Sequence, residues 1–259
     1  MTMDKNKKIG LALGAGGAKG AAHIGALKAF HEEGIEFDII SGCSIGSIVG
    51  ALYAKGLDHE DMLRLVEEMS GGNAASLFAA SFVFGDGLVG AVRNILGGAD
   101  FSDLKKPFAA VAVDAATGKE EVFMGENGNL SLACAASSSV PPTFPPIYSG
   151  KRILVDGAFL NYIPSDLCRV MGAEKVVGVN LGAGRDNNFD LKAVLDDVLP
   201  ENKVPRANRS KKGYDNSDIM IEPDLRAYSG SSVNSFYEMY EIGYNAVKGK
   251  IKDIIEVLR

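Results

Sequence analysis

Residues 37 to 56 read FDIISGCSIGSIVGALYAKG and contain the pentapeptide Gly42-Cys43-Ser44-Ile45-Gly46. Phe37 to Ile40 predicts a short buried strand, and Ser47 to Lys55, followed by a glycine, predicts a helix. A strand, a turn with glycine two positions either side of a serine, and a helix form a nucleophile elbow, which exposes the serine hydroxyl. The alternative is an ordinary strand-to-helix turn in which Ser44 caps the helix.

The histidines argue against a Ser-His-Asp triad. The chain has three, His23, His31 and His59, and none follows residue 59. A serine hydrolase built on this elbow places its partners in the order Ser, then Asp or Glu, then His. A nucleophilic Ser44 would therefore act without a histidine, and activity should survive replacement of any of the three. No two histidines have the spacing of metal ligands and the three cysteines are scattered, so no metal is expected.

A second glycine-rich turn lies upstream of the elbow. Lys8 to Leu13 predicts a strand, Gly14 to Gly20 a turn, and Ala21 to Glu33 a helix. Such a turn presents unpaired N–H groups at the positive end of a helix dipole, where an anion binds. A dinucleotide fingerprint and a Walker loop both fail on the spacing around Lys19. We therefore expect no cofactor, and the anion that remains is the oxyanion of an acyl-transfer intermediate.

Together these segments resemble the patatin-like phospholipases. Three motifs carry the resemblance in sequence order, and the text between them is similar too. The resemblance covers about residues 8 to 182 and thins afterwards. The motifs are Gly14 to Gly20 with Ala22-His23-Ile24-Gly25-Ala26-Leu27, then Gly42 to Gly46, then Val155-Asp156-Gly157-Ala158; the similar connecting segments are Pro107 to Asp114, Ala136 to Pro141 with Phe144 to Pro146, and Asn161 to Pro164.

The resemblance implies a Ser-Asp dyad, with Ser44 as nucleophile and Asp156 as general base. It also implies an oxyanion loop. Two positions in that loop depart from the family, which commonly has glycine where this chain has Ala15 and arginine where it has Lys19. These departures bear on rate and substrate fit more than on reaction class. The implied oxyanion residues are Ala15, Gly16 and Gly17, and the supporting motif residues are Gly42, Gly46, Lys19, Gly20, Gly157 and Ala158.

The local sequence agrees with the role of Asp156. This residue follows the apolar run Ile153 to Val155, so its carboxylate should lie at a strand end in apolar surroundings. Burial raises the pKa of a carboxylate above its usual value of about 3.9 and makes it a better base. The alternative is a surface turn, where Asp-Gly is common.

The activity that the resemblance implies is phospholipase A-type hydrolysis of lipid acyl esters by a serine acyl hydrolase. Residue chemistry alone reaches acyl-ester hydrolysis, and only the resemblance points to lipid. Two alternatives stay open: a catalytically weak regulatory or lipid-binding protein with the same fold, and a hydrolase of soluble esters or acyl thioesters. The expected partner is a lipid or ester substrate, and the oligomeric state is left open.

Composition limits where such a protein acts. The chain has 259 residues, 46% of them apolar, without an apolar run that approaches the length of a membrane span. Its three cysteines form no disulfide framework, which favours a cytoplasmic location. A net charge of −6 argues against a nucleic-acid partner. It also provides no general attraction to anionic lipid, so any peripheral contact with a membrane needs a local patch.

The alternation of strands and helices over the first 180 residues predicts an α/β fold of three layers. In this patatin-like arrangement a mostly parallel central sheet has helices on both faces. We expect a single domain over residues 1–259, with the motif-bearing core at about 8–182. A C-terminal strand, Ile219 to Ile221, and one amphipathic helix, Ser235 to Leu258, should close it over 219–259.

Two segments allow alternative interpretations. Residues 71–100 carry aromatic residues between glycines, which is typical of a lid over an acyl pocket or, alternatively, of a pair of core helices. Residues 183–218 are expected to form a loop around a short helix, Leu191 to Leu199. Its basic residues form either a solvated face or a contact for anionic headgroups. They are Lys203, Arg206, Arg209, Lys211 and Lys212.

Overall fold

The computed structural model describes residues 7–70, 87–125, 128–183 and 190–259. The strands are β1 Ile9–Leu13, β2 Ile39–Cys43, β3 Phe108–Asp114, β4 Lys119–Met124, β5 Ile147–Ser149, β6 Arg152–Asp156, β7 Lys175–Val179 and β8 Ile219–Ile221. The helices are α1 Ala21–Glu32, α2 Ile45–Lys55, α3 His59–Ser70, α5 Gly87–Ile95, α6 Leu130–Ser137, α7 Ser165–Val170, α8 Leu191–Val198, α9 Lys211–Asn216, α10 Phe236–Gly249 and α11 Ile251–Leu258.

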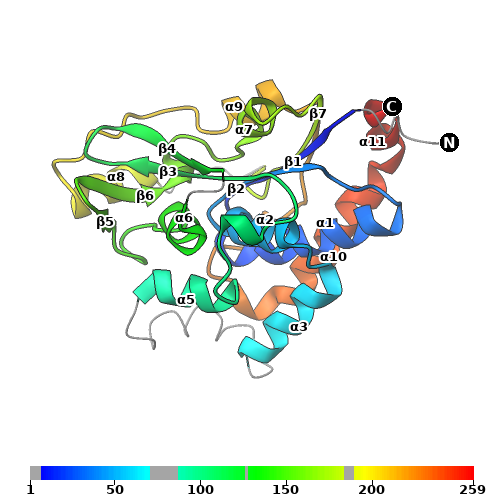
Figure 1. The fold of residues 1–259 in the computed structure, drawn as a ribbon, viewed down its shortest axis with the longest axis horizontal. Helices are drawn as coiled ribbons and strands as arrows, with labels where there is room; N and C mark the ends of the chain where they lie inside the picture. Colours follow the sequence, from blue (N-terminus) through cyan, green and yellow to red (C-terminus); the bar gives the residue numbers. More distant parts are fainter. Residues whose placement is uncertain (1–6, 71–86, 126–127, 184–189) are drawn as a thin grey trace.

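The described strands form one eight-stranded sheet in the order β5-β6-β3-β2-β1-β7-β8, with β4 paired to β3. β1, β2, β3, β7 and β8 run parallel, whereas β4, β5 and β6 pair in the antiparallel sense. Helices cover both faces (Figure 1). The predicted three-layer α/β fold with a mostly parallel sheet is therefore confirmed, and the antiparallel strands lie together at one end.

Alternation along the central strands divides the core between the two faces. Leu11 and Leu13 of β1 join the large apolar cluster under α1, α2 and α10, whereas Ala12 joins a smaller cluster beside α7. Successive side chains of a strand point to opposite faces, so a fully apolar strand such as β1 is what a sheet covered on both sides requires. In Figure 1 α7 and α9 lie above the sheet, and α1, α2, α3, α5 and α10 lie below it.

The C-terminal helices pack directly on α1, and glycine permits the close approach. A side-chain carbon on Gly25 would overlap the carbonyl of Tyr240, and one on Gly243 would overlap the carbonyl of Ala22. Sequence periodicity predicted one closing helix, Ser235 to Leu258. The structure instead breaks it at Lys250 into α10 and α11. Gly249 at the break lacks the side chain that favours continued helix.

The segment after β7 is more ordered than the sequence indicated. The predicted short helix is present as α8, but α9 was not predicted. α9 packs through Gly213, where a Cβ atom would stand 2.7 Å from the Cβ of Ile163. Tertiary packing therefore selects a helix in a sequence whose propensity alone favours a loop.

The predicted lid falls largely outside the described residues, because 71–86 are not among them. The remaining part forms α5, in which Val92 is buried in the main core. None of the described helices combines the length and apolar composition needed to cross a bilayer.

Candidate active site

Ser44 lies between β2 and α2 in a strained backbone conformation. Its φ of 54° and ψ of −128° make it the one non-glycine residue with positive φ in the described part of the chain. Both flanking glycines are required, because a side chain on Gly42 would overlap the carbonyl of Gly46, and one on Gly46 would overlap that of Leu13. The strand, turn and helix predicted for a nucleophile elbow are therefore formed. The packing around the turn keeps Ser44 in a backbone conformation that serine rarely adopts.

Ser137 at the end of α6 holds the elbow in place. The Ser44 N–H donates to Ser137 Oγ at 2.8 Å, and Ser137 Oγ donates to the carbonyl of Val111 at 2.6 Å. Sequence analysis quoted this serine within a family-like segment but assigned it no role. The signal that could have revealed it is a run of three serines at the end of an apolar helix, since hydroxyl groups buried there need partners.

The strands that carry Ser44 and Asp156 meet end to end. β4 pairs with β3 over residues 109–114 and so occupies one edge of that strand. β2 and β6 must therefore share the other edge, β2 along residues 108–111 and β6 along 112–114. Because β2 is parallel to β3 and β6 is antiparallel to it, their carboxyl ends face each other. Ser44, directly after β2, and Asp156, the last residue of β6, are thereby neighbours.

Asp156 is completely buried, and its two oxygens differ in their contacts. Oδ1 accepts the Ala158 N–H at 2.7 Å and faces Cys43 Sγ at 3.7 Å. Oδ2 has no hydrogen-bond donor among the described residues. No hydrogen bond of normal geometry joins Asp156 to the Ser44 side chain, yet the Ser44 hydroxyl lies near enough to lower the pKa of the carboxyl. Oδ2 is therefore the oxygen of this carboxylate that can accept a further hydrogen bond.

Burial dominates the acidity of Asp156. Desolvation raises its pKa to about 6, against the smaller lowering effects of the contacts with Ser44, Ala158 and Cys43 and of the charge on Arg209. A carboxylate in water takes a serine proton poorly, and a desolvated one takes it better. The Gly157 position completes the motif, since a side chain there would overlap the carbonyl of Val111.

We expect ester hydrolysis to depend on a group that titrates near the pKa of Asp156. The general base must be ionised, so kcat/KM should rise with pH and level off above about 6. A rise of kcat/KM in this pH range, the acid limb of the profile, would also be expected if a histidine were the base. His31→Ala and His59→Ala therefore serve as controls. Both variants should keep the limb unchanged in a pH–rate profile. A limb that disappears in either variant would assign the base to that histidine.

The glycine-rich loop between β1 and α1 carries two unpaired N–H groups. Gly14 N–H donates to Val179 O at 3.0 Å, and Ala15 N–H donates to Tyr162 O at 3.0 Å. Within the described residues, the N–H groups of Gly16 and Gly17 have no acceptor. The Ala15 N–H is thus already paired and is not a free donor in this arrangement. Of the three predicted oxyanion residues, Gly16 and Gly17 keep an unpaired N–H.

Lys19 and Gly20 support the loop from behind. The Lys19 side chain is 2% exposed and donates from Nζ to the carbonyl of Leu181 at 3.1 Å. This bond ties the short turn Gly17–Gly20 to the end of β7. Gly20 lets Ile45 pass close by, since a side chain there would overlap the Ile45 side chain. The oxyanion loop and the nucleophile elbow are therefore packed directly against each other.

His23 also supports the loop. Its Nε2 lies 2.8 Å from the carbonyl of Gly14, and burial lowers the pKa of the imidazole to about 4. The ring is therefore neutral at physiological pH and donates from Nε2 to the carbonyl. Sequence analysis expected activity to survive replacement of any histidine. The structure limits that expectation to His31 and His59, whose ring centres lie 5.6 Å apart. Replacing His23 would remove the hydrogen bond to Gly14 O and so loosen the glycine-rich loop.

An apolar pocket opens beside the loop and the elbow. Its cavity volume is about 70 Å³, and every lining residue is glycine or apolar. Gly17, Ile45 and residues of α2 line it together with side chains of α3, α5 and α10, among them Leu65, Ile95 and Phe236. No group of three His, Cys, Asp or Glu side chains suited to a metal occurs in the described part of the chain.

Comparison with known proteins shows the family. The patatin-like phospholipase description matches residues 11–168, more than half of the chain. This chain belongs to the patatin-like phospholipase family. It is 31% identical over 197 residues to a patatin-like phospholipase domain-containing protein of Caenorhabditis elegans, a match that covers 70% of this chain and 14% of that protein. It is 32% identical over 202 residues to an NTE family protein of Mycobacterium tuberculosis, a match that covers 72% of this chain and 54% of that protein. The chain thus spans at most about half of either relative.

Solved structures agree on the fold. VipD from Legionella pneumophila matches with a TM-score of 0.57 at 13% identity, over 97% of this chain and 68% of that chain. ExoU, in its complex with SpcU from Pseudomonas aeruginosa, matches with a TM-score of 0.50 at 15% identity, over 96% of this chain and 52% of that chain. At these identities the likeness extends to the fold alone.

Proposed function

We propose that this chain is a serine acyl hydrolase that cleaves lipid acyl esters, in a phospholipase A-type reaction, with Ser44 as nucleophile and Asp156 as general base. The observation that supports it most directly is the apolar pocket beside the elbow. Gly17 of the glycine-rich loop and Ile45 of the elbow are among its lining residues, and its walls are glycine or apolar side chains. Such walls suit a hydrocarbon chain, which gains free energy in proportion to the apolar surface removed from water.

The reaction follows from the groups around Ser44. Ser44 Oγ attacks the ester carbonyl while its proton passes to Asp156 Oδ2, and the carbonyl oxygen becomes an oxyanion. In this proposal the Gly16 and Gly17 N–H groups, with that of Ile45 at the start of α2, donate to the oxyanion. Collapse returns the proton to the leaving alcohol and leaves an acyl serine. A water molecule then attacks the acyl carbonyl and Asp156 accepts its proton. Asp156 returns that proton to Ser44 Oγ as the acyl–serine bond breaks, and the fatty acid leaves with both residues restored.

Chemical labelling separates this proposal from its alternatives. A fluorophosphonate should attach to Ser44, as read by peptide mass spectrometry, and the labelled protein should lose esterase activity. A non-catalytic regulator with the same fold would remain unlabelled. Turnover of a phospholipid, a monoacylglycerol and an acyl thioester by one preparation distinguishes the lipid hydrolase from a hydrolase of soluble esters or thioesters, and preference for the thioester would contradict the proposal.

The pocket should determine acyl-chain length. Leu65 on α3 lines it, whereas Leu63, half-buried on the same helix, does not. Leu65→Trp adds bulk inside the pocket and should lower kcat/KM for a long-chain p-nitrophenyl ester at least about tenfold, the effect of losing a few buried methylene groups. Short-chain turnover should change little.

Leu63→Trp is the matched control, since it adds the same volume to the same helix outside the pocket. Both variants should be compared by thermal unfolding to correct for overpacking. Equal losses on long and short esters in Leu65→Trp would show that the acyl chain lies elsewhere.

A further inference from the structure

The dyad lies between two different surroundings. On the side of α1, α2, α3 and α5 the apolar pocket receives the acyl chain. On the other side of the sheet, where α7 and α9 lie (Figure 1), Tyr162 packs against a buried apolar cluster that includes Ala158 and Leu167 of α7. Because the acyl part of an ester occupies one side of the nucleophile, the alcohol part must extend away from it, toward the Tyr162 side.

Tyr162 links the oxyanion loop to Arg209. Its carbonyl accepts the Ala15 N–H at 3.0 Å, and its own N–H donates to the carbonyl of Arg209 at 2.8 Å. The Arg209 guanidinium lies over the Tyr162 ring, 5.6 Å from its centre. An arginine stacked on an aromatic ring keeps its hydrogen-bond donors free at the edge of the guanidinium plane. The backbone and the ring thus fix the position of this cation relative to the catalytic loop.

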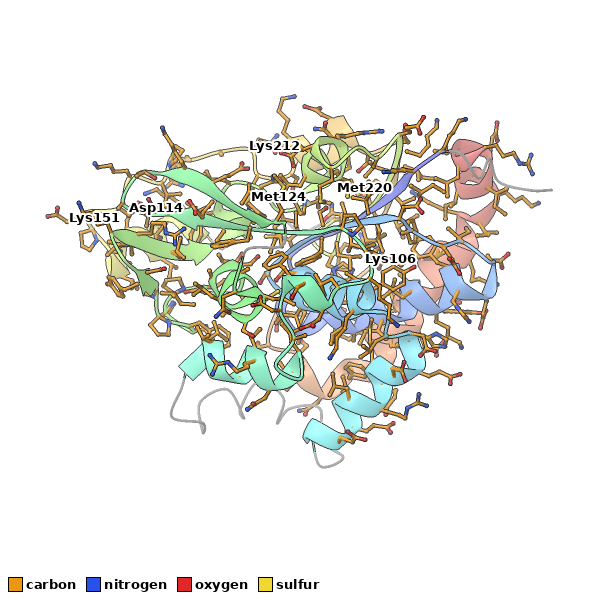
Figure 2. The ribbon with its side chains drawn as sticks, viewed as in Figure 1. Lys106, Asp114, Met124, Lys151, Lys212 and Met220 are labelled. Carbon is orange, nitrogen blue, oxygen red and sulfur yellow. The ribbon has the colours of Figure 1, made fainter. Side chains whose placement is uncertain are left out.

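Arg209 differs from three of the basic residues around it, Arg206, Lys211 and Lys212, which pair with carboxylates. Arg206 pairs with Asp190 at 2.6 Å, and Lys211 pairs with Asp215. Lys212, labelled in Figure 2, pairs with Glu120 at 2.7 Å and Asp166 at 3.3 Å. Arg209 is half-buried and has no carboxylate partner among the described residues. Its charge does reach the buried Asp156. A cation of this kind, stacked and close to the dyad, is available to a ligand.

We propose that Arg209 binds an anionic phosphate carried by the alcohol part of the ester substrate. The proposal rests on the proposed function, because it concerns the part of the substrate that leaves. The planar guanidinium matches two phosphate oxygens, and a charge-assisted pair near a buried site is stronger than one in open solvent. Arg209 would then select phosphate-bearing esters over neutral esters with the same acyl chain.

The test compares two substrates that share an acyl chain and a glycerol unit. Lysophosphatidylglycerol carries a phosphodiester, and the matching monoacylglycerol does not. Both are presented at equal mole fraction in micelles of a neutral detergent, so that binding to the interface is the same. Arg209→Gln should lower the ratio of kcat/KM for lysophosphatidylglycerol to kcat/KM for monoacylglycerol about 10- to 100-fold, the range for losing a hydrogen bond to a charged group. Arg209→Lys should fall between.

Arg206→Gln is the matched control, because it removes a nearby positive charge that is already paired, and its ratio should equal that of the parent. Equal losses on both substrates in Arg209→Gln, with a shifted acid limb in the pH–rate profile, would show that Arg209 only tunes Asp156 and would overturn the proposal. An unchanged ratio would also overturn it. If inorganic phosphate inhibits turnover of both substrates equally and only when Arg209 is present, the site binds free phosphate and the proposal is wrong.

Failure of the proposed function gives a different result. In that case the parent protein hydrolyses neither substrate nor a short p-nitrophenyl ester, and a fluorophosphonate leaves Ser44 unlabelled. A protein that labels at Ser44 and hydrolyses the short ester, but shows no Arg209-dependent ratio, would refute the role of Arg209 alone.

Discussion

Asp156→Asn should abolish ester hydrolysis and yet give a more stable protein at pH 8. The amide cannot accept the Ser44 proton, so kcat should fall by about four orders of magnitude or more, as when a member of a coupled catalytic unit is lost. The kcat of Ser44→Ala should fall by a similar factor, and the kcat of the double variant should fall no further than that of either single variant. Initial rates on a short p-nitrophenyl ester measure all three.

The stability gain follows from the raised pKa of Asp156. Burial raises the pKa of this carboxyl to about 6 in the folded protein, from 3.8. Between those values the folded state binds more protons than the unfolded state, so the free energy of unfolding falls as pH rises through this window. Above it the buried charge costs about 3 kcal/mol, and Asn carries no such charge. Thermal unfolding should favour Asp156→Asn at pH 8 and show the gain fading toward pH 4; a variant that is less stable at both pH values would mean that Asp156 is not buried as a charge.

Gly17→Ala should reduce kcat by a factor of about one hundred or more while changing KM little, since an oxyanion donor acts on charge that develops in the transition state. The φ of Gly17 is 59°, and a Cβ atom there would stand 2.6 Å from the carbonyl of Gly230. The loop must shift to accommodate it, and the unpaired N–H groups of Gly16 and Gly17 would be displaced with it.

Gly34→Ala is the matched control for Gly17→Ala. Gly34 has a similar φ of 67°, but a Cβ atom there meets no atom within 4 Å. Both variants lose about 1 to 2 kcal/mol of stability from the left-handed backbone. Only Gly17→Ala should lose activity. A higher KM with an unchanged kcat in Gly17→Ala would move this loop from transition-state stabilisation to substrate binding.

The elbow and the loop could be predicted because their signals are local. Glycine spacing around Ser44, and the turn between an apolar strand and a helix, follow from short-range sterics that any observer can apply to the sequence. The position of Asp156 could not be derived in that way. Its closeness to Ser44 depends on β6 running antiparallel on the same edge of β3 as β2, and no local pattern contains that pairing. Only the family resemblance indicated the dyad.

The remaining features depend on partners distant in sequence. Ser137 was passed over because its role appears only when α6 meets the elbow. Ala15 was predicted as an oxyanion donor, but its N–H donates to the carbonyl of Tyr162. The sequence around Ala15 gives no sign of that distant partner. The pocket draws Val233 and Phe236 from beyond the matched family region, where an amphipathic pattern identifies an apolar face without saying what it covers. Interactions between residues at least 93 positions apart determine all three.

The end-to-end meeting of β2 and β6 makes the approach of Ser44 to Asp156 a late event in the folding of the chain. Ser44 and Asp156 are more than a hundred residues apart, and they become neighbours only after β3 has hydrogen-bonded both strands along one edge. Contacts of such long range form slowly, because the chain must first lose the entropy of closing a large loop. In the proposed mechanism, a nascent or partly unfolded copy therefore carries the nucleophile without its base, and hydrolysis would begin only after the sheet around β3 is complete.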